Sequence, residues 1–168
     1  MTLLLLLKGY EMGAVATLPT FLDAVVAGLK LRAGLSGVNV FSGPVDDLTA
    51  GKEAIVFGVE MISAENEYMT MPQVECWERY TVSGWTWVSK PGANETVIKA
   101  ARDRAFALLE ELVDYLASVN TTTAATVAAL GVDDARVESW RLTQFFGDGT
   151  RDCKLEYSVA VKANYTPA

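Results

Sequence analysis

The stretch Val74–Lys90, VECWERYTVSGWTWVSK, decides the fold of this chain. Its residues alternate with a period of two, which is the period of a β-strand, and Trp77, Trp85 and Trp87 share one face. The other face is also apolar and carries Val74, Cys76, Tyr80, Val82 and Val88. A strand that is apolar on both faces is covered on both faces. We therefore expect one cover to be a helix of this chain and the other to be a second layer or another subunit.

A helix is predicted upstream of this strand. Thr17 or Thr20 can cap it, Pro19 falls in its first turn or just outside, and Gly34 or Gly37 ends it. Its apolar residues recur at helical spacing: Phe21, Leu22, Val25, Val26 and Leu29. Few charged residues interrupt the pattern, so this helix is expected to be covered on more than one side.

A longer helix and a hairpin are predicted downstream. Asn94 caps a strongly amphipathic helix that runs to about Val119. The segments Arg136–Phe146 and Arg151–Ala163 alternate as strands and are joined through Gly147–Gly149. In the last strand, the residues predicted to face the core are Cys153, Leu155, Tyr157, Val159 and Val161.

Short strands at Val38–Phe41 and Glu53–Met61 complete the pattern, and Ser63–Pro72 is expected to be an irregular loop. The fold class is therefore α+β, with a mostly antiparallel sheet of about five strands packed by two main helices. Residues 17–168 form one domain, and residues 1–16 form an apolar N-terminal arm. The arm is predicted to contact a neighbouring subunit through Leu3, Leu4, Leu5, Leu6 and Leu7, with packing on its own domain as the alternative.

Composition and charge exclude several classes of function. Apolar residues make up 51% of the chain and charged residues 21%, which suggests apolar surface reserved for a partner. The net charge is −7, without the clustered positive charge that non-specific nucleic-acid binding requires. Histidine is absent, which removes the usual catalytic triads and His-ligated metals. No stretch reaches the 18 or more apolar residues of a membrane span, so we expect a soluble protein that does not bind membranes.

The remaining reactive groups do not form a recognisable catalytic set. Glu75 and Glu78 are three residues apart on a strand and point to opposite faces, so they cannot converge on a substrate. Cys76 and Cys153 lack the spacing of a zinc site and are expected in the core. We predict no catalytic residue, no metal site and no cofactor. The residues predicted to form a subunit or tube interface are Tyr68, Met69, Met71, Trp77, Trp85, Trp87, Phe145 and Phe146. The alternative is that they pack within their own domain.

The order of these motifs resembles the tail terminator proteins of long-tailed bacteriophages. The resemblance extends from Leu18 to Ala163. The stretches that carry it are Gly37–Val40, Gly43–Pro44, Glu53–Gly58, Trp77–Gly84, Pro91–Gly92, Ala100–Ala105 and the closing hairpin Arg136–Ala163. The leucine-rich N-terminus departs from the family pattern.

The resemblance implies a structural role without chemistry. Such a protein forms a ring, usually a homo-hexamer, on the last ring of the tail tube at the tail–neck junction of the virion, after assembly in the host cytoplasm. Its partners would be the major tail tube protein and a head-completion or connector protein, with DNA passing through the lumen without specific binding. Two alternatives in the same context are a head–tail connector or head-completion protein and a tail tube subunit. A small ligand-binding module or enzyme is the alternative from a different class.

Overall fold

The computed structural model describes residues 14–45, 53–68, 76–121, 132–147 and 149–165. In these residues the elements follow the predicted order of helix, three strands, long helix and two strands. They are α1 Ala14–Lys30, a 3-10 turn Ala33–Leu35, β1 Asn39–Ser42, β2 Glu53–Tyr68, β3 Cys76–Pro91, α2 Glu95–Thr121, β4 Asp134–Phe146 and β5 Thr150–Tyr165. The predicted α+β class with five strands and two main helices is confirmed.

The strands form one sheet in the order β1-β2-β3-β5-β4. Only β1 and β2 pair in parallel among these strands; the β2–β3, β3–β5 and β4–β5 pairs are antiparallel, which confirms a mostly antiparallel sheet. The strand predicted from Val74–Lys90 is β3, and it lies at the centre of the sheet between β2 and β5. The closing hairpin is the predicted one, and β4 pairs with β5 from Asp134 to Phe146 with one shift of register, between Val137 and Ser139.

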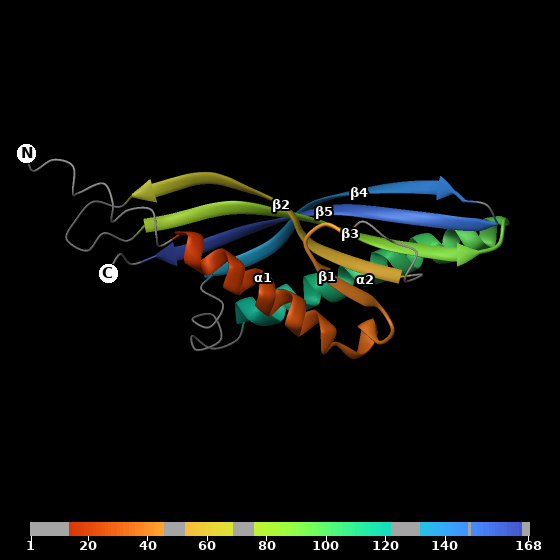
Figure 1. Ribbon diagram of the computed structural model, residues 1–168, viewed down its shortest axis with the longest axis horizontal. Helices are drawn as coiled ribbons and strands as arrows, with labels where there is room; N and C mark the ends of the chain where they lie inside the picture. Colours follow the sequence, from red (N-terminus) through yellow and green to blue (C-terminus); the bar gives the residue numbers. More distant parts are fainter. Residues whose placement is uncertain (1–13, 46–52, 69–75, 122–131, 148, 166–168) are drawn as a thin grey trace, which may run out of the picture.

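Both helices lie on one side of the sheet (Figure 1). α1 packs against β1 and β2, and α2 packs against β3, β5 and β4. The hydrophobic core lies between the two helices and the sheet. It includes the residues of β5 that were predicted to face the core, and all of them are buried: Cys153, Leu155, Tyr157, Val159 and Val161. Within the described residues no helix covers the opposite side of the sheet, and we call that side the open face.

Three polar contacts support this packing. The Asn94 side-chain oxygen accepts a hydrogen bond from the Val97 amide at 3.0 Å, which caps α2 as predicted. Glu53, at the start of β2, accepts hydrogen bonds from Lys90 at 2.7 Å and from Arg104 of α2 at 2.8 Å. Burial alone would raise the pKa of Glu53, but these two cations hold it below its ordinary value.

The bounds of α1 differ from the prediction. The helix already includes Ala14, so Pro19 lies inside it rather than in or before its first turn, and neither Thr17 nor Thr20 caps it. Ala14 and Ala16 are good helix formers, and Pro19 removes one backbone hydrogen bond near the start of the helix. The helix also ends at Lys30, several residues before Gly34 and Gly37, because the chain enters a 3-10 turn at Ala33–Leu35.

β2 is longer than the sequence predicted. Residues 63–68, expected to begin an irregular loop, continue the strand to Tyr68 and pair with the start of β3. The registers shift between Phe57 and Glu60, where Gly58 has φ of 80°, a conformation that favours glycine. This bulge lets β2 follow β3 for its whole length although its outer part is polar.

Candidate subunit interface

The open face carries aromatic side chains on the strands where the sequence predicted them. Trp85 and Trp87 alternate along β3 with buried residues that face the helices, so both indoles point to the open face and are half-buried. Phe41 of β1 and Phe145 of β4 point the same way. We call Phe41, Trp85, Trp87 and Phe145 the aromatic cluster.

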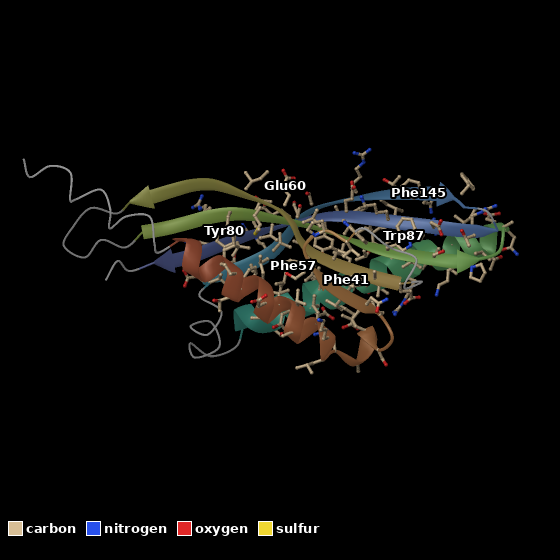
Figure 2. All side chains as sticks on the ribbon, viewed as in Figure 1. Phe41, Phe57, Glu60, Tyr80, Trp87 and Phe145 are labelled. Atoms are coloured by element: carbon tan, nitrogen blue, oxygen red, sulfur yellow. The ribbon has the colours of Figure 1, made fainter. Side chains whose placement is uncertain are left out.

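The aromatic cluster spans the width of the sheet. The rings of Trp87 and Phe145 lie on either side of β5 with their centroids 6.0 Å apart and their planes tilted by 33° (Figure 2). At the other end, Val56 of β2 lies in register between Phe41 and Trp85 and is fully buried. Phe145 is 42% exposed, so the cluster presents aromatic surface to solvent. Exposed aromatic surface of this kind is typical of protein interfaces.

Lys154 connects the aromatic cluster with a charged part of the open face. Its ammonium lies 5.7 Å from the centre of the Trp85 ring and donates a hydrogen bond to Glu156 at 2.7 Å. This hydrogen bond lowers the pKa of Glu156. The charge of Lys154 is therefore held beside an aromatic face, an arrangement that is favourable in its own right and is common at interfaces.

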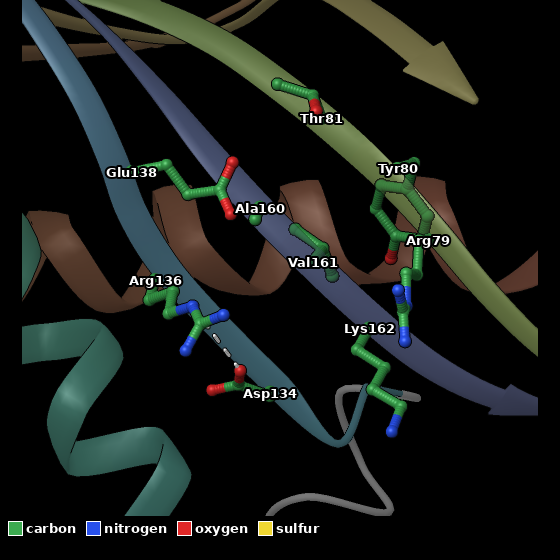
Figure 3. A pocket seen from close by; sticks show the side chains of 9 residues that line it. All are labelled: Arg79, Tyr80, Thr81, Asp134, Arg136, Glu138, Ala160, Val161 and Lys162. Atoms are coloured by element: carbon green, nitrogen blue, oxygen red, sulfur yellow. Dashed lines mark ion pairs between the residues drawn. The ribbon is translucent and has the colours of Figure 1, made fainter. Parts of the chain in front are cut away.

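Two hollows lie on the sheet where β3, β5 and β4 run side by side. Arg79, Arg136 and Lys162 line the first one, with Asp134 and Glu138 among its acidic residues (Figure 3). The guanidinium of Arg136 lies 4.0 Å from the Asp134 carboxylate.

The second hollow is lined by Trp85 and Lys154 together with Arg141. Its floor includes Ser139 and Ser158, whose hydroxyl oxygens are 2.6 Å apart. Glu60 and Glu156 also line this hollow, so side chains of both charges surround it.

The structure separates the two adjacent phenylalanines of the predicted interface. Phe145 belongs to the aromatic cluster, whereas Phe146 is in register with Arg151 on the other face of the sheet, with the Arg151 guanidinium 4.9 Å from its ring centre. Tyr68 and Trp77 lie at the adjoining ends of β2 and β3, in register with Cys76 and Glu67 respectively. Met69, Met71 and the leucines of residues 3–7 lie outside the described residues.

One exposed aromatic residue was missed by the sequence prediction. Trp140 of β4 is 56% exposed and stacks edge-on against Phe106 of α2, with the ring centroids 5.0 Å apart. A register shift between Val137 and Ser139 changes which alternate positions of β4 face the helices. The signal was present in the sequence, since Val137 and Leu142 are five residues apart and cannot share a face in a regular strand.

The described residues contain neither a metal-binding cluster nor an activated thiol. They contain no group of three or more Cys, Asp or Glu placed to hold a metal ion. Cys153 is buried as predicted, and burial raises the pKa of its thiol, which is the opposite of what a nucleophile requires. No described helix is both long enough and apolar enough to cross a membrane.

No family model and no curated protein matches this sequence. Among solved structures, one chain from the virion of a native gene transfer agent particle is similar, with a TM-score of 0.49 and 15% sequence identity. The similarity covers 88% of this chain and 98% of that chain.

Proposed function

We propose that this protein is a structural virion protein that forms a closed ring of six copies at the head-proximal end of a phage tail tube. The ring ends tube polymerisation and joins the tail to the head connector, and the protein is not an enzyme. The order of its sequence motifs supports this role, because the resemblance to tail terminators extends over nearly the whole chain. The α+β fold is the one that the resemblance implies.

The observation that carries the proposal is the aromatic cluster on the open face. Trp85 and Trp87 lie at the centre of the sheet on a side that no described helix covers. A monomer gains nothing from presenting Phe145 and two half-buried indoles to water, whereas a subunit interface buries them. Each subunit of a ring needs two different contact surfaces, and the open face supplies one of them.

The proposed partners follow from this position. One side of the ring would contact the major tail tube protein and the other a head-completion or connector protein at the tail–neck junction. DNA would pass through the lumen without specific binding, which is consistent with the net charge of −7.

The proposal is tested by adding the purified protein to tail tube protein that is polymerising in vitro. Tubes capped by the ring should stop growing, and electron microscopy should show a single terminal ring at one end. Long tubes formed by this protein alone would identify it as a tube subunit instead. Unchanged tube growth would refute the role of a terminator.

Two variants of equal exposure test the role of the open face. Phe145 and Val113 are both 42% exposed, but Val113 lies on α2 on the other side of the molecule. Phe145→Ser should weaken ring formation and tube capping, whereas Val113→Ser should leave both unchanged. Equal effects of the two substitutions would contradict an interface on the open face.

A further inference from the structure

The outer edge of β4 is a long strand edge without a neighbour. β4 is the last strand of the sheet, and no strand of the described residues pairs with its outer side. After the shift of register, Ser139–Phe146 pairs regularly with β5 and contains neither proline nor lysine. Edge strands that stay single are usually short or carry such residues, because their free backbone groups otherwise attract another strand. We call Ser139–Phe146 the acceptor edge.

Exposed aromatic side chains flank the acceptor edge on both faces of the sheet. Trp140 points to the helix side, as its buried partner Tyr157 on β5 does, and it is 56% exposed beside Phe106 of α2. Phe145 points to the open face, where its ring lies beside Trp87. A strand added at this edge would place successive side chains on these two faces in turn. The edge therefore fits a segment that is apolar at every position rather than an amphipathic strand.

The sequence contains a segment of this kind in front of α1. Leu3–Leu7 is a run of five leucines, and no other run of five large aliphatic residues occurs in the chain. It lies among residues 1–13, outside the described residues. As a strand, five residues span about 17 Å, so the run is short enough to lie within the acceptor edge. We call Leu3–Leu7 the leucine arm.

The leucine arm of the same chain is badly placed to cover the acceptor edge. α1 packs against β1 and β2 and begins at the end of the sheet where Tyr80 lies, whereas Phe145 lies near the other end (Figure 2). The registers place Tyr80 level with Ala135, ten residues before Phe145, which corresponds to about 30 Å along the sheet. Residues 3–13 span at most about 40 Å, and they would also have to cross to the opposite edge. The same chain could therefore reach Phe145 only when fully stretched.

A neighbouring subunit meets no such limit. An arm that belongs to one copy and a strand edge that belongs to the next are different surfaces, as the closed ring requires. Adding a strand to an exposed sheet edge is also a common way for one protein chain to bind another, since the main-chain hydrogen bonds supply affinity.

We propose that the leucine arm of one subunit adds as a strand to the acceptor edge of the next subunit. This inference rests on the proposed ring and names a contact that joins its subunits. The outward N–H and C=O groups of β4 hold the arm, and its leucines pack alternately beside Trp140 on the helix side and beside Phe145 on the open face.

Photo-cross-linking from the arm tests which surface accepts it. A full-length chain with benzoylphenylalanine in place of Leu5 is mixed in urea with isotope-labelled wild-type chain and refolded, so that both occur in one ring. After irradiation, mass spectrometry should find the unlabelled arm joined to labelled peptides of β4. Links found only within the unlabelled chain would show that the arm packs on its own domain. Links to any other part of the neighbour would overturn the acceptor edge.

Two matched variants of the arm test the strand pairing itself. Proline has no N–H group, and successive N–H groups of a strand point to opposite sides, so L4P/L5P removes one donor that faces β4. L4P/L5P should raise the concentration at which half of the rings dissociate by about ten-fold or more. The control L4V/L5V keeps both N–H groups and the apolar character, and should change that concentration much less.

Hydrogen exchange reads out the same contact without counting rings. The β4 amides that do not pair with β5 should exchange at least about ten-fold faster in L4P/L5P than in the wild type, because the covering strand is lost. The amides of β3, which has a neighbouring strand on both sides, should be unaffected. Equal exchange of the β4 amides in the two proteins would contradict the proposal.

A second matched pair tests the acceptor side. Trp140 and Ile62 are both 56% exposed, but Trp140 lies on β4 and Ile62 lies on β2. Trp140→Ser should weaken the ring as L4P/L5P does, whereas Ile62→Ser should leave it intact. Equal effects of the two substitutions would overturn the acceptor edge. Thermal unfolding at the wild-type temperature shows that a lost ring is not a lost fold.

The outcomes separate this inference from the proposed function. If the wild-type protein forms rings, but the arm does not cross-link to β4 and L4P/L5P leaves the rings intact, the contact is wrong and the ring stands. If the cross-link joins copies into open chains rather than closed rings, the contact stands and the role of a terminator fails. If the wild-type protein stays a monomer, both fail.

Discussion

Replacing Tyr157 with phenylalanine tests how the central strands are held together. Tyr157 of β5 reaches across β3, and its hydroxyl donates a hydrogen bond to the Val56 carbonyl oxygen of β2 at 2.8 Å. Gly84 of β3 lies beneath the ring, and a Cβ there would come within 2.6 Å of the Tyr157 side chain. One side chain therefore links three strands next to the point where β2 shifts register.

The expected cost follows from the burial of this bond. Tyr157 is only 3% exposed, so water cannot replace the lost donor and the Val56 carbonyl loses a partner. A lost buried hydrogen bond of this kind costs about 1 to 3 kcal/mol of the free energy of unfolding. For a chain of this size, 2 kcal/mol corresponds to a fall in Tm of about 4 to 8 °C.

The assay is urea unfolding and a thermal melt of wild-type and Tyr157→Phe protein, followed by circular dichroism. Burial raises the pKa of Tyr157, so the folded state keeps the proton that the unfolded chain releases near its ordinary pKa of about 10. The wild type should therefore lose stability as the pH rises above about 10, and the variant should lose less. A loss below about 0.5 kcal/mol at pH 7 would show that the hydrogen bond from Tyr157 to Val56 contributes little to stability.

Gly84→Ala should lower the free energy of unfolding, measured in urea, by about 2 kcal/mol or more, because the new Cβ would collide with the Val56 carbonyl oxygen. The neighbouring substitution Ser83→Ala serves as the control and should change stability little. Asn94→Ala should lower the free energy of unfolding by about 1 kcal/mol, because it removes the cap of α2. Asn94→Asp should retain most of that stability, since aspartate can also cap a helix, and equal losses in the two variants would contradict capping. Glu53→Gln should lower the free energy of unfolding by about 1 kcal/mol at pH 7, because it weakens the contacts with Lys90 and Arg104. Because the pKa of Glu53 lies below 4.5 in the folded state, the wild type should lose this advantage only as the pH falls below that value, and an advantage unchanged at pH 2 would contradict the assignment.

The sequence predicted the elements whose patterns are local. The alternation in Val74–Lys90 and in Arg151–Ala163 corresponds to β3 and β5, and the amphipathic segment after Asn94 corresponds to α2. Each pattern reports burial of one face, which is the main determinant of where these elements lie. The end of β2 could not be predicted in this way. Residues 63–68 are polar and form a strand because β3 pairs with them, which is a tertiary effect that overrides propensity.

The candidate interface was predicted in part. Trp85 and Trp87 were assigned to one face of a strand that is apolar on both faces, and they do share the open face. The sequence could not show that Phe145 joins Trp87 across β5, because this contact depends on the order of strands in the sheet. The two hollows were missed for the same reason, since their lining residues come from several strands. Phe145 and Phe146 lie on opposite faces of the sheet because successive side chains of a strand alternate.

The native mass of the purified wild-type protein is the most direct test of the central claim, that the open face serves assembly. We expect one dominant species of six times the 18.2 kDa of the chain, and this species should disappear in Phe145→Ser. A protein that stays a monomer of 18.2 kDa at every concentration reached would contradict it. An open-ended series of larger masses would also contradict it, because a terminator must form a closed ring.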